Sequence, residues 1–461
     1  VMLLGIGWSL AFVVVGCGFD LQMYGDGSIF SYAIAAEQAW AFHWHNISGR
    51  AFVYLLAHWP AETYVRFSGD AHGGVVLHGL LFFCTPLVGL CATWSADQSE
   101  GRSLFLHACA STAVICPLVF GFPTEMWVAH AVFWPMLALA RSADWSLTRT
   151  ALFAAGLTAL MLSHGGGVLL AGVIVASALL PGPRQPSRPR MLIGGGIAVF
   201  VWAAVLLAFR PDPYIAKVIN TAAFSFVDLR NLIDPVIGTM IAAIIGYMLA
   251  AWLCDRILRL HSPSIAALFS VLWALAIYYR YFDASLLADA RYPLRTALLV
   301  LPPFFATSAL LGIRQVGRAH PLVARLGTLR QKIWPGHLAA VLVLITAVHV
   351  VETAKFVRVW SDYKTALAAL ATAKDAGPES PAARFASSAL ISDGLNRVAW
   401  SSTTHFLSIL VAPRLIPARL VISPNPAYWW LSCQTATDSQ RHSTAIPQAS
   451  RAFIRAYACS H

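Results

Sequence analysis

The chain has 461 residues, of which 58% are hydrophobic and only 11% are charged. About a quarter of the residues of a soluble domain are charged, so this composition excludes an ordinary soluble protein and predicts a polytopic membrane protein. The net charge of +11 does not indicate a nucleic-acid partner, because the arginines lie mainly in short loops between apolar segments, where they set membrane orientation.

Apolar segments recur from the first residue to about residue 354. Each is long enough to cross a hydrocarbon layer of about 30 Å. We therefore expect an all-α protein with about eleven membrane-spanning helices. These lie near residues 1–17, 75–95, 103–120, 125–141, 147–163, 166–180, 191–209, 235–254, 263–281, 296–313 and 337–354.

Basic residues distinguish the two sides of the predicted bundle. Alternate loops hold most of the short-loop arginines, near residues 96–102, 141–149, 181–190, 255–262 and 314–335. Because basic loops stay in the cytoplasm, the remaining segments face outward. These outer segments are residues 18–74, 121–125, 163–167, 210–234, 282–295 and the chain after about residue 355.

The first outer loop, residues 18–74, is too apolar for a flexible linker. The stretches Ser28–Trp44 and Ala51–Phe67 mix aromatic with charged and polar residues. This pattern predicts two amphipathic helices lying in the membrane interface. The alternative is that both helices are buried against the bundle.

Asp26 is the first candidate for chemistry, because acids near a bilayer are costly to desolvate. It lies in Tyr24–Ser28 (YGDGS), where glycines on both sides let the backbone approach a ligand. A carboxylate there suits a general base or a ligand of a divalent metal. The alternative is an N-cap of the following helix. Asp20 is a weaker candidate that also fits a marker of the water boundary.

Glu125 lies in a short outer turn, residues 121–127 (GFPTEMW). It could pair with Asp26 across one cavity, with His130 one or two turns deeper on the same helix. The alternative role is a favourable interaction of the Glu125 carboxylate with the helix dipole.

His164 lies in the next outer turn, residues 163–167 (SHGGG). Backbone N–H groups of such a turn can form a phosphate nest, with His164 as a hydrogen-bond donor or proton carrier. Glycines at a helix end also permit close helix packing, which is the alternative.

Three arginines precede the tenth predicted span on the outer side, against the orientation trend: Arg280, Arg291 and Arg295. Guanidinium groups bind phosphate through paired hydrogen bonds, which predicts a phosphate site with Arg291 as its main ligand. The alternative is pairing with acids of the same loop, Asp283 and Asp289, or with anionic lipid.

The chain after residue 354 predicts a small, separate outer domain, residues 355–461, of α/β-like or irregular structure. Residues 1–354 would form the membrane domain. Cys433 and Cys459 lie in the polar tail, and an oxidising compartment would favour a disulfide between them.

These elements together resemble the GT-C class of integral membrane glycosyltransferases. Asp26 matches the catalytic acid of the family's first outer loop, Glu125 its second acid, and Arg291–Tyr292 an Arg-Tyr element near the lipid phosphate. The resemblance implies a GT-C-like fold in a bacterial inner membrane, with interfacial helices in the first outer loop and the active site and C-terminal domain facing the periplasm.

The same resemblance implies a polyprenyl-phosphate sugar donor in the phospholipid bilayer and a lipid or glycan acceptor. Asp26 would deprotonate the acceptor hydroxyl in an inverting transfer. Glu125 and His164 would orient the acceptor or a divalent metal, Mg or Mn, held by Asp26 and Glu125. Arg291 would neutralise the departing phosphate, supported by Tyr292, Arg280, Arg295 and Arg50.

Three other functions stay open from the sequence. An O-antigen ligase or polymerase would use Arg50, Arg291 or His164 without depending on Asp26. A transporter or lipid flippase usually contains repeated halves and broken helices near the midplane, and neither is evident here. A non-catalytic subunit of a membrane complex is the third.

Overall fold

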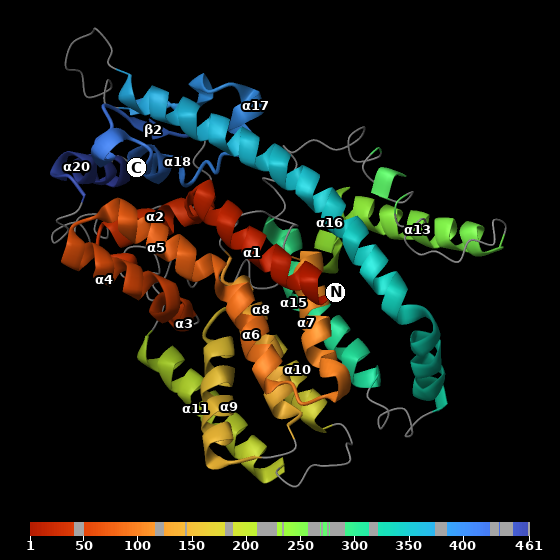
Figure 1. The fold of residues 1–461 in the computed structure, drawn as a ribbon. Coiled ribbons are helices and arrows are strands. Elements are labelled where there is room, and N and C mark those ends of the chain that lie inside the picture. The colour runs from red at the N-terminus through yellow and green to blue at the C-terminus, as the bar shows by residue number, and fades with distance from the viewer. Residues whose placement is uncertain are drawn as a thin grey trace.

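The computed structural model describes residues 1–40, 50–115, 124–142, 145–179, 188–209, 228–232, 235–256, 268, 271–273, 276, 291–312, 321–373, 385–424, 433 and 446–459. This part of the chain is mostly helical (Figure 1). Three helices in it are long and apolar enough to cross a membrane, namely Ala71–Ala96, Pro189–Ala208 and His337–Thr372. Several shorter apolar helices accompany them, and together these helices are those of a membrane protein.

The helices of the bundle follow most of the predicted apolar segments. They are α1 (Met2–Gly18), α5 (Ala71–Phe83), α6 (Thr85–Ala96), α7 (Ser103–Ile115), α8 (Met126–Ala140), α9 (Leu147–Met161), α10 (Gly165–Leu179), α11 (Arg188–Ala208), α13 (Pro235–Arg256), α15 (Arg291–Gly312) and α16 (Pro321–Thr372). Most of the predicted span at 263–281 lies outside the described residues, so the expected number of spans stays a prediction.

The span predicted at 75–95 consists of two helices, α5 and α6, which meet at Cys84. Pro86 lies in the first turn of α6. Proline has no N–H to continue the hydrogen bonds of α5, so the hydrogen bonding is interrupted there, while Cys84 keeps a helical backbone and Ala71–Ala96 remains one span candidate.

Glycines let helices of the bundle pack closely. A Cβ atom on Gly89 of α6 would lie 2.6 Å from the carbonyl oxygen of Ala131 in α8, and one on Gly5 of α1 would lie 2.6 Å from Cβ of Cys109 in α7. Large rings fill the remaining core, among them Phe12 against Trp127. Small residues at helix contacts are the usual solution in membrane bundles.

The first outer loop contains η1 (Leu21–Met23), α2 (Gly27–Ala35), α3 (Ala51–Val53), η4 (Tyr54–His58) and α4 (Trp59–Ser68). The expectation of an interfacial helix over Ser28–Trp44 is wrong for α2, which ends at Ala35 and is buried along its whole length. It packs under the C-terminal segment, so its apolar residues are covered by protein. By contrast, α4 exposes Trp59 and Phe67, the latter by 87%.

Helix α16 continues without a break across residue 354 and leads into the C-terminal segment (Figure 1). That segment contains β1 (Phe385–Ser387), β2 (Leu420–Ile422), α17 (Asp393–Asn396), α18 (Thr404–Leu410) and α20 (Gln448–Cys459). The strands pair in parallel, with Phe385 opposite Leu420. The short helices η5 (Glu100–Arg102), η7 (Leu229–Leu232), η10 (Ser388–Leu390) and η11 (Pro413–Leu415) complete the described elements.

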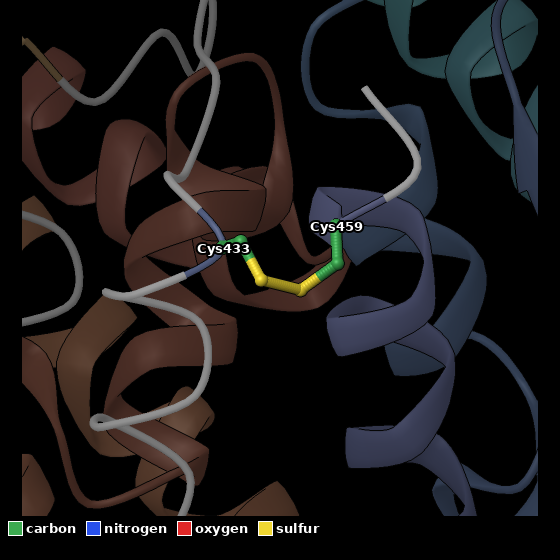
Figure 2. Close-up of a disulfide and its surroundings, with 2 residues drawn as sticks. All are labelled: Cys433 and Cys459. Atoms are coloured by element: carbon green, nitrogen blue, oxygen red, sulfur yellow. A yellow bond between two sulfur atoms is a disulfide. The ribbon is translucent and has the colours of Figure 1, made fainter.

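The C-terminal segment packs directly on the first outer loop. The rings of Tyr32 in α2 and Phe406 in α18 have centroids 5.1 Å apart. A disulfide joins Cys433 to Cys459 at the end of α20, and the two cysteines are 26 residues apart in the sequence (Figure 2). This is the pair expected from the sequence.

Candidate functional site

Asp26 begins α2, yet its side chain makes no capping hydrogen bond to that helix. Gly25 precedes it with a φ of 60°, in the left-handed region that glycine adopts readily. Ser28 donates its hydroxyl hydrogen to the Gly25 carbonyl at 2.8 Å. The Asp26 carboxylate instead faces an arginine, and its Oδ2 atom lies 3.7 Å from Nη2 of Arg295.

Glu125 immediately precedes α8 and is only 1% exposed. It also makes no side-chain cap. Its Oε1 atom lies 2.9 Å from Nη1 of Arg50, which precedes α3 in the first outer loop. A buried ion pair therefore engages this carboxylate, and its place just before α8 still allows the favourable interaction with the helix dipole that was the alternative.

Arg295 links Asp26 to the residue that precedes Glu125. It lies in the first part of α15, and besides facing Asp26 its Nε–H group donates to Oγ1 of Thr124 at 3.4 Å. Thr124 is adjacent to Glu125, so the first outer loop and the starts of α8 and α15 converge at one point. Asp26, Glu125, Arg50 and Arg295 therefore form one cluster, in which two carboxylates balance two guanidinium groups.

His164 lies in the turn between α9 and α10 and is buried. Burial holds the pKa of this imidazole well below its usual 6.5, and the charges of Arg50 and Arg295 lower it further. The backbone N–H of Gly166 donates to Nδ1 at 3.1 Å. The imidazole is consequently neutral, with its proton on Nε2.

The turn around His164 does not present a phosphate nest. The N–H of Gly166 engages the His164 ring, and the N–H of Gly167 donates to the His164 carbonyl oxygen at 2.8 Å. Two of the donors that the sequence offered to an anion are therefore used within the turn. What His164 contributes to the site is its side chain.

Other predicted residues lie elsewhere or are outside the described residues. Arg280 lies outside the described residues, and so do the side chains of Arg291 and Tyr292 at the start of α15. Asp20 pairs with Lys364 and not with the cluster. His130 lies deeper in α8, with its Nε2 atom 3.0 Å from the Ser111 hydroxyl of α7.

Sequence reasoning missed Thr124 and His58. His58 is buried at the end of η4, where burial, the neighbouring His78 ring and the charge of Arg50 hold its pKa well below 6.5. The His58 and His78 ring centroids are 4.8 Å apart. Thr124 could have been predicted, because it is a polar residue next to the candidate Glu125. Nothing local in the sequence links His58 to Arg50.

The donor set does not favour a divalent metal. Among the described residues, no group of three or more His, Cys, Asp or Glu side chains could hold a metal ion. Asp26 and Glu125 each face an arginine, whose positive charge competes with a cation for the carboxylate oxygens. The metal expected from the resemblance stays a prediction, and the chemistry below is derived without it.

Comparison with protein-family models, with curated proteins and with solved structures finds no match for this chain.

Proposed function

We propose that this protein is an integral membrane glycosyltransferase that moves a sugar from a polyprenyl-phosphate donor to a lipid or glycan acceptor of the cell envelope. The observation that carries the proposal is the position of Arg295, which contacts both the Asp26 carboxylate and the Thr124 hydroxyl beside Glu125. A carboxylate base beside a phosphate-binding guanidinium is the pair of groups that displacement at a phosphate-activated sugar needs.

Asp26 is the general base in this proposal. Its carboxylate takes the proton of the acceptor hydroxyl while the hydroxyl oxygen attacks the anomeric carbon of the donor. The bond between that carbon and the phosphate oxygen breaks, and the lipid phosphate leaves with the electron pair. A single displacement of this kind inverts the configuration at the anomeric carbon.

Among the arginines that the structure describes, Arg295 is the one that receives the departing phosphate in this proposal. Its Nη2 atom lies 3.7 Å from the carboxylate of the proposed base Asp26, and its Nε–H group donates to Thr124 at 3.4 Å, whereas Arg50 is paired with Glu125 at 2.9 Å. Guanidinium groups offer five N–H donors, and a phosphate oxygen is a stronger acceptor than a hydroxyl. Arg291, which the sequence assigned first to this role, stays a candidate, because its side chain lies outside the described residues.

His164 is unsuited to act as the general base, which leaves Asp26 for that role in the proposal. A neutral imidazole that accepts a hydrogen bond at Nδ1 carries its proton on Nε2, so this atom donates and does not accept. In the proposal, Nε2–H orients the acceptor or a phosphate oxygen. Glu125 fixes Arg50 and keeps the cluster electrically neutral before substrate binds.

The disulfide supports a location on the outer side of a bacterial inner membrane. Disulfides persist in oxidising compartments, and Cys433–Cys459 lies in the segment that packs on α2, next to Asp26. The basic loops between predicted spans give the same orientation independently. The site would therefore face the periplasm.

A second function uses the same cluster with other residues. An O-antigen ligase or polymerase would depend on Arg50 and His164, and both lie at this site, since the Arg50 charge acts on the His164 ring. Such an enzyme would not require Asp26. The proton on Nε2 of His164 argues against it.

The test is transfer of labelled sugar from a panel of polyprenyl-phosphate donors to envelope acceptors by the full chain in vesicles. We expect transfer by the wild type and loss of transfer in Asp26→Asn. Asp393→Asn, an exposed acid in the first turn of α17, is the matched control and should transfer normally.

Normal transfer by Asp26→Asn would contradict the base assignment and favour the ligase-like function. Absence of transfer by the wild type with every donor would contradict the proposal as a whole and favour a transporter.

A further inference from the structure

The segment that carries Asp26 has an unusual backbone. Helix α1 ends at Gly18, and Asp20 then adopts φ 56° and ψ 39°, in the left-handed region. Gly25 adopts φ 60°, also in that region. Aspartate enters this region more readily than most residues other than glycine, and neighbouring groups hold Asp20 there.

Helix α16 supplies those groups from three successive turns. Phe356, Trp360 and Lys364 are spaced by four residues and therefore share one face of the helix. The Trp360 indole N–H donates to the Phe19 carbonyl at 3.0 Å, and the Lys364 ammonium donates to the same carbonyl at 2.9 Å. The ammonium group also lies 2.8 Å from Oδ2 of Asp20.

The same face holds the other end of the segment through Tyr24. The Tyr24 ring is 1% exposed and meets the rings of Phe356 and Trp360 edge to face, at centroid distances of 4.9 Å and 5.4 Å. Tyr24 lies two residues before Asp26. Both ends of residues 19–24 are thus attached to one rigid helix.

We propose that Phe356, Trp360 and Lys364 form a positioning clamp that fixes the place of the Asp26 carboxylate. The clamp explains why Asp20, which lies apart from the charged cluster, is an acid in a left-handed conformation. Its carboxylate binds the Lys364 ammonium, and the same ammonium donates a hydrogen bond to the carbonyl oxygen of the preceding residue, Phe19. The catalytic part of this inference rests on the proposed function.

Contacts of this kind do more than bury apolar surface. Three hydrogen bonds converge on the backbone and side chain of two consecutive residues, and they fix direction as well as proximity. A general base must lie within hydrogen-bond reach of the proton that it takes, and a displacement of about 1 Å can reduce a rate by about 100-fold. Loosening the clamp should therefore affect turnover more than donor binding.

The experiment compares Lys364→Gln, Lys364→Arg and Trp360→Phe in the full chain. Gln removes the ammonium group, Arg restores a cation, and Phe keeps a ring but removes the N–H donor. Arg358→Gln is the matched control, because it removes an exposed charge from the same stretch of α16. The readouts are backbone hydrogen–deuterium exchange of residues 19–28, and kcat and KM for donor in the transfer assay.

We expect faster exchange of residues 19–28 in Lys364→Gln and Trp360→Phe, with exchange elsewhere unchanged, and wild-type exchange in Lys364→Arg and Arg358→Gln. The kcat value of Lys364→Gln should fall by about 10- to 100-fold with KM for donor within about twofold. Asp20→Asn keeps a residue that tolerates φ 56°, and combining it with Lys364→Gln should cost no more than Lys364→Gln alone, which already removes the ammonium group that both contacts need.

Unchanged exchange of residues 19–28 in Lys364→Gln would overturn the clamp. Faster exchange with unchanged kcat would overturn its role in positioning Asp26. If the wild type transfers no sugar, the proposed function fails, and the exchange comparison by itself decides whether the clamp exists.

Discussion

Four buried or half-buried charged side chains meet at the site, and their pairing decides which of them can move. Isolated charges are expensive to bury, so Asp26 with Arg295 and Glu125 with Arg50 neutralise each other. The Arg50–Glu125 pair is the shorter one, and Glu125 is almost fully buried. In the proposed reaction, Arg50 and Glu125 stay together, while the Arg295 guanidinium binds the phosphate beside Asp26.

At the same scale, His164 makes the stability of the protein depend on pH. Its pKa is below 6.5 in the folded state because of burial and of Arg50 and Arg295, so below pH 6.5 the unfolded state binds the proton more readily. The contribution of His164 to the free energy of unfolding is therefore fully present above pH 6.5. It falls as the pH decreases below 6.5, by up to about 1.4 kcal/mol per pH unit.

When the pH is lowered from about 7.5 to about 5.5, which is about one unit below the usual imidazole pKa, we expect His164→Gln to lose less thermal stability than the wild type. Part of the loss remains, since burial lowers the pKa of His58 and of His405 as well. His72→Gln, at an exposed position, is the control. Thermal unfolding at several pH values measures the difference, and equal losses in wild type and His164→Gln would contradict the neutral imidazole.

At the scale of elements, the close packing of α6 against α8 fixes where Glu125 lies, because Glu125 immediately precedes α8. Gly89→Ala would place a methyl group 2.6 Å from the Ala131 carbonyl oxygen. The two helices would have to separate, which should reduce the free energy of unfolding by about 1–3 kcal/mol. A lower melting temperature in detergent is the expected result.

Gly195→Ala in α11 is the matched control for this substitution. A Cβ atom there meets nothing within 4 Å, and alanine favours a helix over glycine by up to about 1 kcal/mol. The control should therefore be neutral or stabilising. A Gly89→Ala variant as stable as Gly195→Ala would show that α6 and α8 are not in close contact.

At the scale of the whole molecule, the disulfide holds the C-terminal segment in the fold that covers α2. It links Cys433 to α20, and Tyr457 of α20 packs on His405 of α18 with ring centroids 4.8 Å apart. Closing a loop of 26 residues contributes about 3–4 kcal/mol in the chain-entropy description.

Replacing Cys433 and Cys459 together by serine should lower the melting temperature, and reduction of the wild type should have the same effect. Cys91→Ser, at an exposed free cysteine, is the control and should change neither the melting temperature nor the effect of reductant on it. Thermal unfolding with and without reductant measures this, and unfolding of the wild type that is insensitive to reductant would contradict a stabilising disulfide.

Sequence patterns predicted the helical membrane character and much of the candidate site, because hydropathy and isolated charges are local signals. Asp26, Glu125, His164, Arg50 and Arg295 were all candidates, and the structure brings them together. The pairing of Arg50 with Glu125 could not be predicted, since it depends on how separate helices pack. The burial of α2 was only the alternative to an interfacial helix for the same reason, because its cover comes from α18 at the other end of the chain.

The role of Asp26 as the base is the central claim, and a single-turnover measurement tests it most directly. Wild type and Asp26→Asn are loaded with labelled polyprenyl-phosphate donor, donor binding is measured separately, and transfer is started with acceptor. We predict that Asp26→Asn binds donor as the wild type does and transfers it about 10²- to 10⁴-fold more slowly. An unchanged single-turnover rate, or a loss explained entirely by weaker donor binding, would contradict the account.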